Sequence, residues 1–296
     1  MSLAIGQTLK GRNASYYVTK VLKHDVAHQA KIISGDQHPP SSKSALAVLK
    51  LRPQGREAVM YERERGCYEL EGIARSPHIR ALLDLIGHDG SEPHASNASR
   101  PQSLAVFDDL KGVHNDVNPN NVFVSGANGS QPKVKLGDLG CWSAYPNPRG
   151  LEGIGVFHST GVWGLGVTFT HSLASRTIFE PSDKIIKDMA VEWCLAKIIR
   201  LVGPMEQPVR PEYAEEFAMA EYLERETFVH PEKGVKERFI KVGTIREELE
   251  NIPGKKIENR CLEFIESLLV LDHTKRPTAR EALEHPWIRG AEDDID

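Results

Sequence analysis

The chain has 296 residues and a formal net charge of −4, a balance that argues against a globally basic nucleic-acid-binding protein. Hydrophobic residues make up 40% of the sequence, which is enough apolar side chain to build a core and excludes disorder over the whole length. No apolar run approaches the roughly 18 residues of a membrane span, and the N-terminus lacks the basic start and long apolar stretch of a signal peptide. We therefore expect a cytoplasmic or nuclear protein with no nucleic-acid or membrane partner.

Strand-like patterns dominate the first third of the chain. Alternating side chains, β-branched content and short apolar runs predict strands at 17–22, 30–34, 45–51 and 104–107. Apolar residues at helical spacing predict one helix at 57–70. Polar segments rich in Gly, Pro and Ser predict loops at 36–44 and 88–102.

Helical patterns dominate after residue 162. Apolar residues at helical spacing predict helices at 162–174, 183–201, 211–225, 259–271 and 279–285. The last residues, 291–296, form an acidic tail. A strand-rich first third followed by a helix-rich remainder predicts an α+β protein with two lobes.

The segment after residue 113 carries residue types suited to phosphoryl transfer. Asp116 and Asn121 lie five residues apart on a short loop that contains Pro119, directly before an apolar strand. Asp138 follows a second apolar strand and is part of an Asp-Leu-Gly sequence. Phosphoryl transfer needs a base near the acceptor hydroxyl and oxygen ligands for Mg²⁺. Asp116 is therefore a candidate base, and Asn121 and Asp138 are candidate metal ligands.

In these motifs the sequence resembles a eukaryotic-type protein kinase domain. His114-Asn115-Asp116 with Asn121 is similar to the kinase catalytic loop, and the Asp-Leu-Gly at 138–140 is similar to the metal-binding Asp-Phe-Gly. Other similar segments are the lysine strand at 47–50, the opening of the central large-lobe helix at 161–166 and the C-terminal helix at 272–287. The resemblance covers about residues 15–290. It is to serine/threonine kinases rather than tyrosine kinases, and more narrowly to divergent kinase-like proteins of fungi.

The resemblance implies a fold, cofactors and an activity. It implies a two-lobed kinase-like fold, with a small β-rich N-lobe at about 15–109 and a larger helical C-lobe at about 110–290. It implies ATP and Mg²⁺ as cofactors and phosphoryl transfer to serine or threonine of a protein substrate. By the same resemblance, Lys50 binds the nucleotide and pairs with Glu64, with Glu62 as the alternative partner.

Four features depart from the kinase pattern. No glycine stands between the first two predicted strands, where kinases use glycine to let the backbone close over phosphates. Asn115 replaces the arginine that pairs with a phosphorylated activation loop, and Asn118 replaces a cation that steadies the transferring phosphate. Gly161 replaces the aspartate that ties the central helix to the catalytic loop. We therefore expect weaker nucleotide binding, no phosphate-dependent switch and a loss of rate on the order of a hundredfold.

Two blocks of the kinase pattern are missing, so we expect an incomplete C-lobe. Asp116 follows Asp109 by seven residues, where the family places two helices. Trp163 follows Asp138 by 25 residues, and the chain has no Ala-Pro-Glu triplet to end an activation segment. The glutamate of that triplet would pair with Arg276, and a buried arginine left without a partner costs about 3–5 kcal/mol. A missing helix with about five large apolar side chains forfeits roughly 10 kcal/mol.

Three interpretations of function follow from the sequence. The first is a divergent serine/threonine kinase that uses Asp116 as its base, with impaired activity. The second is a pseudokinase that acts as a binding or scaffold module. The third is an incomplete isoform or gene model of an active kinase, which the clean gaps between intact motifs favour. The sequence predicts neither the protein substrate nor a binding partner.

Overall fold

A computed structural model describes residues 3–24, 26–33, 45–55, 57–86, 103–125, 133–144, 157, 159–206 and 211–293. The loops predicted at 36–44 and 88–102 and the end of the acidic tail lie outside these residues. The chain divides into two compact units. The N-terminal unit comprises Met1–Val106 and Phe123–Trp142, and the C-terminal unit comprises Phe107–Val122 and Ser143–Asp296. Within the described ranges, no helix has the length and apolar character needed to cross a membrane.

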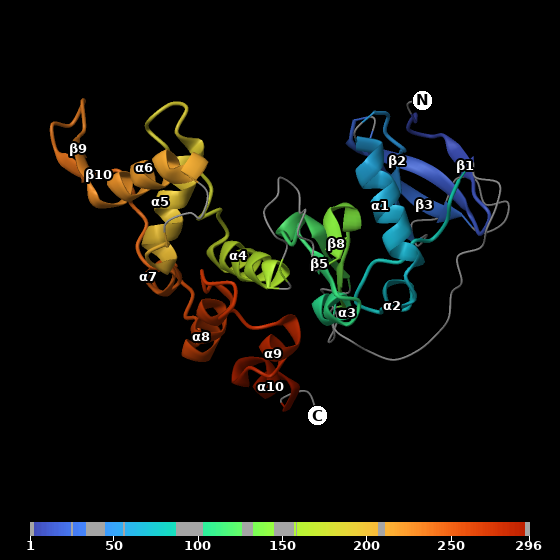
Figure 1. Cartoon of the computed structure of the whole chain (residues 1–296). Coiled ribbons are helices and arrows are strands. Elements are labelled where there is room, and N and C mark those ends of the chain that lie inside the picture. Colours follow the sequence, from blue (N-terminus) through green and yellow to red (C-terminus); the bar gives the residue numbers. More distant parts are fainter. Residues whose placement is uncertain are drawn as a thin grey trace. The chain divides into compact units, whose positions relative to one another are not determined.

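The N-terminal unit contains an antiparallel sheet in the order β1-β2-β3-β4, drawn in blue in Figure 1. Its strands are β1 (Thr8–Lys10), β2 (Ser15–Lys23), β3 (Ala27–Ile33) and β4 (Leu46–Lys50). The strands predicted at 17–22, 30–34 and 45–51 are therefore confirmed, with shifted ends. Val18 lies opposite Ala30, and Ala30 lies opposite Ala47. These three side chains are buried, so alternation gives the sheet one apolar face.

Helix α1 (Glu57–Glu69) follows the sheet, and the short helix α2 (Glu71–Ala74) follows α1. The helix predicted at 57–70 is confirmed. Glu57 lies in the first turn of α1, where a negative charge interacts favourably with the helix dipole. The buried residues of α1 are Glu64 and Cys67, three residues apart and hence on one face. The helix therefore turns an acidic side chain inward.

A hairpin and a parallel bridge complete the N-terminal unit. The hairpin consists of β6 (Val122–Ser125) and β7 (Lys133–Leu136). Leu136 at the end of β7 forms a parallel bridge with Ile79. The guanidinium of Arg80 lies 4.1 Å from the centre of the Phe123 ring, a cation–π contact that links the hairpin to the segment after α2. The one-turn helix η2 (Leu139–Cys141) follows directly.

The strand predicted at 104–107 is wrong, because Ser103–Asp109 forms helix α3. Periodicity does not separate a buried strand from a short buried helix when the apolar run has only four residues. Ala105, Val106 and Phe107 are each at most 3% exposed, so consecutive side chains are buried instead of alternating between two environments. Burial on all sides is compatible with a helix, and tertiary packing decides the outcome here.

The C-terminal unit is mainly helical. Its helices are α4 (Thr160–Ala174), α5 (Ala190–Val202), α6 (Ala214–Arg225), α7 (Ile245–Glu250), α8 (Asn259–Leu268), α9 (Ala279–Leu283) and α10 (Pro286–Asp293). Shorter elements of this part of the chain are β5 (Gly112–His114), η1 (Pro119–Asn121), β8 (Trp142–Ala144), η4 (Pro211–Tyr213), β9 (Thr227–Val229) and β10 (Lys236–Arg238). Strands β5 and β8 pair, as do β9 and β10. In Figure 1 the helices of this unit run from yellow-green at α4 to red at α10.

Four of the five predicted helices are confirmed as α4, α6, α8 and α9, and the fifth begins late. The prediction placed a helix at 183–201, whereas α5 begins at Ala190. The Asp183 carboxylate accepts a hydrogen bond from the Trp193 indole at 3.1 Å and pairs with the Lys197 ammonium at 2.5 Å. Asp183 therefore lies against the side of α5 and does not extend it.

One apolar cluster forms the core of the C-terminal unit. Its fully buried members include Trp193, Leu223, Leu249 and Ile265, which come from four different helices. Two capping boxes, at Thr244 before α7 and at Thr278 before α9, satisfy backbone N–H groups at the helix starts. The helices of this unit therefore pack around one core.

Candidate active site

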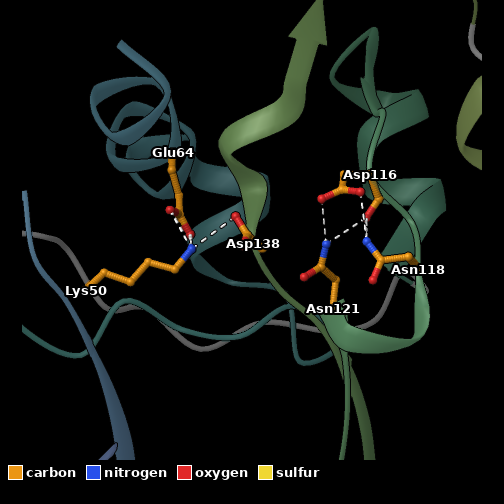
Figure 2. Close-up of polar contacts among 6 residues, drawn as sticks. All are labelled: Lys50, Glu64, Asp116, Asn118, Asn121 and Asp138. Atoms are coloured by element: carbon orange, nitrogen blue, oxygen red, sulfur yellow. Dashed lines mark hydrogen bonds and ion pairs between the residues drawn. The ribbon is translucent and has the colours of Figure 1, made fainter. Parts of the chain in front are cut away.

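Three charged side chains meet in the N-terminal unit. The Lys50 ammonium lies 2.8 Å from both carboxylate oxygens of Glu64 and 3.0 Å from Oδ1 of Asp138. Figure 2 shows the ammonium between the two carboxylates. We call Lys50, Glu64 and Asp138 the lysine group. Lys50 comes from β4, Glu64 from α1 and Asp138 from the turn after β7, so residues 88 positions apart in sequence share one ion pair.

The structure pairs Lys50 with Glu64 and not with Glu62. Glu62 instead pairs with Arg52 at 2.8 Å and with Arg65 at 3.5 Å. The side chain of Glu64 is 11% exposed, and burial raises its pKa although the Lys50 charge acts in the opposite direction. The backbone N–H of Leu139 also hydrogen-bonds Glu64 and stabilises its charged form. The Lys50 ammonium therefore stabilises the ionised form of Glu64 against the effect of burial.

Asp138 adopts a left-handed backbone conformation with φ +60° and ψ +71°. Aspartate tolerates this region better than most residues, but the conformation still costs free energy unless neighbours fix it. Its neighbours are tightly packed. Leu139 is fully buried, and a Cβ added at Gly137 would lie 2.9 Å from the Phe123 ring. This packing presents the Asp138 side chain, which is 46% exposed, to both Lys50 and solvent.

Two amides hold a carboxylate in the C-terminal unit. The Asn118 side chain donates to Oδ1 of Asp116 at 2.8 Å, and the Asn121 side chain donates to Oδ2 at 2.9 Å. Both amides also donate to the Asp116 backbone carbonyl. We call Asp116, Asn118 and Asn121 the aspartate group, which Figure 2 also shows. Each carboxylate oxygen of Asp116 therefore accepts a hydrogen bond from a different amide, which fixes the orientation of the carboxylate.

The loop that carries the aspartate group is braced from within. The side chain of Asn118 caps η1 by accepting the Asn120 N–H at 2.9 Å. His114 is 1% exposed, accepts the Asp116 N–H on Nδ1, and contacts the Phe107 ring edge-on at 5.6 Å. These contacts give His114 a structural role in bracing the loop.

Helix α4 supports the same loop through residues that sequence reasoning missed. A Cβ at Gly164 would lie 3.0 Å from the Val117 carbonyl oxygen, so glycine permits a close approach of helix and loop. The hydroxyl of Thr168 shares its hydrogen between the Gly164 carbonyl of its own helix at 2.8 Å and the Val117 carbonyl at 3.3 Å. Gly161 has no side chain to tie the helix to the loop, but Gly164 and Thr168 make this contact one and two turns later. The Gly-x-x-Gly-x-x-x-Thr spacing was the available signal.

Asn115 contacts the strand that follows the Asp-Leu-Gly sequence. Its side-chain amide donates to the Ser143 hydroxyl at 3.2 Å, and the two residues lie on or next to the paired strands β5 and β8. Kinases of the usual pattern carry an arginine at this position that pairs with a phosphate. Here a neutral amide and a hydroxyl make a contact that needs no phosphate.

Arg276 is satisfied by backbone carbonyls. Its guanidinium donates to the carbonyls of Val270, Ser159 and Leu271 at 2.8, 2.9 and 3.2 Å and lies 4.9 Å from the centre of the Trp163 ring. Burial lowers the pKa of Arg276. In the part of the chain that the structure describes, Arg276 forms no ion pair. Among the described residues, backbone carbonyls and an aromatic face therefore satisfy the guanidinium N–H groups, while burial still disfavours the charge.

The residues of the two groups suit Mg²⁺-ATP in their chemistry. Asn121 directs its amide nitrogen to Asp116, so its side-chain oxygen points away from that carboxylate (Figure 2). Asp138 uses Oδ1 toward Lys50 and is half-exposed. Amide and carboxylate oxygens are the hard ligands that Mg²⁺ prefers, and a lysine ammonium suits phosphate oxygens. Among the described residues, no cluster of three or more His, Cys, Asp or Glu suggests a different metal site.

A sheet-bearing unit with a paired lysine and a helical unit with an amide-held aspartate define a member of the protein-kinase-like superfamily. The sequence model of the protein kinase domain matches residues 102–288, and this chain therefore belongs to that family. The matched range includes the aspartate group and Asp138 but not Lys50 or Glu64.

Solved structures agree on the fold. The chain is similar to the crystal structure of the PF14_0431 kinase domain, with a TM-score of 0.57 and 14% identity over 97% of this chain and 98% of that one. In all, 838 solved chains match, so the likeness does not depend on one structure. None of the curated proteins compared with this sequence matches it. At 14% identity the structural likeness establishes the kinase fold alone.

Proposed function

We propose that this chain transfers the terminal phosphoryl group of ATP to a serine or threonine hydroxyl of a protein substrate. The observation that carries the proposal is the lysine group, in which two carboxylates hold one ammonium at 2.8 and 3.0 Å. An ammonium fixed in this way is suited to neutralise the α- and β-phosphate oxygens of ATP. Glu64 positions Lys50, because its carboxylate is buried and has no other ammonium or guanidinium within salt-bridge distance among the described residues.

In this reaction Asp116 takes the proton of the substrate hydroxyl. The O–H bond breaks, the hydroxyl oxygen forms a bond to phosphorus, and the bond from phosphorus to the ADP oxygen breaks. Asn118 and Asn121 orient the carboxylate before substrate arrives, since each donates to a different oxygen. Asn121 and Asp138 would hold Mg²⁺ through their side-chain oxygens, and the bound ion supplies neutralisation of phosphate charge.

A second candidate function is a pseudokinase that binds a partner without turnover. It is favoured by the turn between β2 and β3, where Lys23, His24 and Val26 stand in place of glycines. In this turn the Val26 N–H donates a hydrogen bond to the Lys23 carbonyl. It is also favoured by Asn118, which brings no positive charge to the transferring phosphate. Both features reduce phosphate contacts, and neither disturbs the fold.

The test is thermal melting of the purified chain with and without millimolar Mg²⁺-ATP. A ligand at 100 times its dissociation constant stabilises a fold by about 2.7 kcal/mol, so we expect a clear Mg²⁺-dependent rise in Tm. Lys50→Met is expected to abolish the rise, whereas the matched variant Arg52→Met, whose side chain pairs with Glu62, is expected to retain it. A cooperative melt that Mg²⁺-ATP does not shift would contradict ATP-dependent transfer and favour the pseudokinase.

A kinase assay then separates the two candidates if nucleotide binds. The chain is incubated with radiolabelled ATP and a generic protein substrate, and phosphoserine and phosphothreonine are measured. Mg²⁺-dependent incorporation that requires Asp116 supports the kinase. Binding without incorporation supports the pseudokinase.

A further inference from the structure

Two carboxylates contact the Lys50 ammonium. An ammonium has three N–H donors. Lys50 donates to both carboxylate oxygens of Glu64 at 2.8 Å, and Oδ1 of Asp138 lies 3.0 Å from the same nitrogen. Figure 2 shows the nitrogen with its contacts to both carboxylates. A phosphate oxygen that binds Lys50 must therefore take the place of one of these carboxylates.

The two carboxylates are not held equally. Glu64 makes two contacts with Lys50, its side chain is 11% exposed, and it accepts a hydrogen bond from the Leu139 N–H. Asp138 contacts Lys50 through one oxygen, and its side chain is 46% exposed. Removing the cation from buried Glu64 leaves an uncompensated charge, which costs more than releasing half-exposed Asp138 to water. Asp138 is therefore the carboxylate that a phosphate displaces.

Asp138 cannot move far when it is displaced. Its backbone is held in the left-handed region at φ +60°. The next residue, Leu139, is fully buried, and a Cβ added at Gly137 would lie 2.9 Å from the Phe123 ring. Only side-chain rotation is therefore open to Asp138, and its negative charge stays beside Lys50. A phosphate bound to Lys50 alone would face this charge at short range in a partly buried setting, where repulsion is stronger than in water.

We propose that Asp138 is an internal counter-ion of Lys50, which a polyphosphate displaces only when Asp138 binds a divalent cation instead. The proposal rests on the proposed function in one respect, namely that the lysine group receives the phosphates of ATP. Carboxylate oxygens suit a hard divalent cation, and such a cation would neutralise the charge that otherwise repels phosphate. Asp138 therefore excludes metal-free polyphosphate from Lys50 and admits its metal complex.

Coupling of this kind is reciprocal, because two ligands linked through one equilibrium change each other's affinity by the same factor. Lys50 competes with the cation for Asp138, and Asp138 competes with phosphate for Lys50. Neutralising Asp138 should therefore strengthen the binding of metal-free ATP. Removing the Lys50 ammonium should strengthen the binding of the cation alone.

Isothermal titration calorimetry of the full chain tests the first consequence. ATP is titrated in EDTA and in excess Mg²⁺, and inorganic tripolyphosphate is titrated in parallel as a probe that has neither base nor ribose. We expect Asp138→Asn to bind both metal-free ligands about tenfold more tightly than the wild type does, and to lose most of the Mg²⁺ dependence. Asparagine tolerates the left-handed backbone, so the variant keeps the local fold.

Glu62→Gln is the matched control. It removes the same charge from the same unit, at a carboxylate that pairs with Arg52 and Arg65. We expect its affinity for metal-free ATP to stay within about twofold of the wild-type value. A gain as large as that of Asp138→Asn would overturn the proposal, because the effect would then reflect total charge and not displacement from Lys50. Equal binding of metal-free ATP by the wild type and Asp138→Asn would overturn it as well.

Titration with Mn²⁺, followed by electron paramagnetic resonance, tests the second consequence without nucleotide. Mn²⁺ takes the same oxygen ligands as Mg²⁺. We expect Lys50→Met to bind Mn²⁺ about fivefold more tightly than the wild type does, and Arg52→Met to leave the affinity unchanged. Unchanged or weaker Mn²⁺ binding by folded Lys50→Met would contradict the competition. The Asp138→Asn titrations keep the proposal testable if Lys50→Met does not fold.

Phosphate transfer is measured separately, so that the two proposals can fail independently. The expected binding pattern without transfer would refute the proposed phosphoryl transfer and support the role of Asp138. Transfer by a wild-type chain that binds ATP equally well with and without Mg²⁺ would support phosphoryl transfer and refute the role of Asp138.

Discussion

The lysine group and the aspartate group each hold a carboxylate, but they do so by different physics. In the lysine group a cation lies between Glu64 and Asp138, and the side chain of Glu64 is largely buried. In the aspartate group two neutral amides bind Asp116 at 2.8 and 2.9 Å, the distances of ordinary hydrogen bonds. The first arrangement is sensitive to charge and pH, whereas the second depends on the exact direction of side-chain amides. Substitutions in the two groups should therefore produce different signatures.

The largest effect is expected for Asp116→Ala on catalysis. Loss of a general base lowers the rate by about 10²–10⁴-fold, and we expect a fall in kcat of about 10³-fold with little change in Tm. The measurement is phosphate transfer from labelled ATP. Asp109→Ala is the matched control, since Asp109 pairs with Arg280 on the surface and should leave the rate unchanged. Equal rates for wild type and Asp116→Ala would refute the assignment of Asp116 as the base.

The next largest effect is expected for Lys50→Met on stability. Removing one partner of a buried pair costs about 3–5 kcal/mol, and we expect about 2 kcal/mol here because the Lys50 side chain is 33% exposed. The loss is measured by urea unfolding. Arg52→Met removes a more exposed cation from Glu62 and is expected to cost less than about 0.5 kcal/mol. Similar losses in the two variants would show that the Lys50–Glu64 pair stabilises the fold no more than the exposed Arg52–Glu62 pair does.

The lysine group also predicts a direction of pH dependence. The pKa of Glu64 is raised above its ordinary value of 4.5, so the folded state binds the proton more tightly than the unfolded state. Stability contributed by Glu64 is therefore present below pH 4.5 and is lost as pH rises through the raised pKa. Lys50→Met removes the cation that opposes the shift, so its destabilisation should be greater at about pH 8 than at about pH 5. A Lys50→Met variant with no such difference would show that Glu64 is solvated in the folded state.

The aspartate group should respond to amide removal in a graded way. Asn121 is buried and donates two hydrogen bonds, and we expect Asn121→Ala to destabilise the C-terminal unit by about 2 kcal/mol. Asn118 is half-buried and caps η1, so Asn118→Ala should cost about 1 kcal/mol. Both losses are measured by urea unfolding and should vary little between about pH 5 and about pH 8. The reverse ranking would indicate that the cap, and not the buried amide, holds the loop.

The smallest expected effect concerns glycines on the helices that carry or support the two groups. Gly164→Ala brings a Cβ to 3.0 Å from the Val117 carbonyl oxygen, and we expect a loss of about 1 kcal/mol as α4 and the loop move apart. Gly66→Ala on α1 meets no atom within 4 Å and is expected to stabilise the N-terminal unit by about 0.5–1 kcal/mol. Thermal melting of both variants measures the contrast. Stabilisation by Gly164→Ala would mean that the close approach is not required.

The sequence predicted elements well where their pattern was long or strongly periodic. The helices at 57–70 and 162–174 agree with α1 and α4 because many positions contributed to each pattern. The run at 104–107 was assigned to the wrong class because four apolar residues carry no usable period. The start of α5 was missed because Asp183 bonds to side chains of that helix, a contact that local sequence does not encode.

The Lys50–Glu64 pair was predictable from the sequence, whereas the contacts that support the candidate site were not. Lys50 and Glu64 were chosen from the kinase resemblance, and the structure brings them together. The contacts of Asn118 with Asp116, and of Thr168 with Val117, depend on side-chain direction and on helix position. Such contacts arise from tertiary structure, so the residue types alone did not predict them.

The environment of Arg276 has a consequence for how this chain tolerates change. Its acceptors are main-chain carbonyls of residues 159, 270 and 271. A carbonyl is present whatever amino acid occupies the position, so point substitutions there cannot abolish the acceptor. The hydrogen-bond partners of Arg276 are therefore set by the path of the backbone and not by the side chain at any one position.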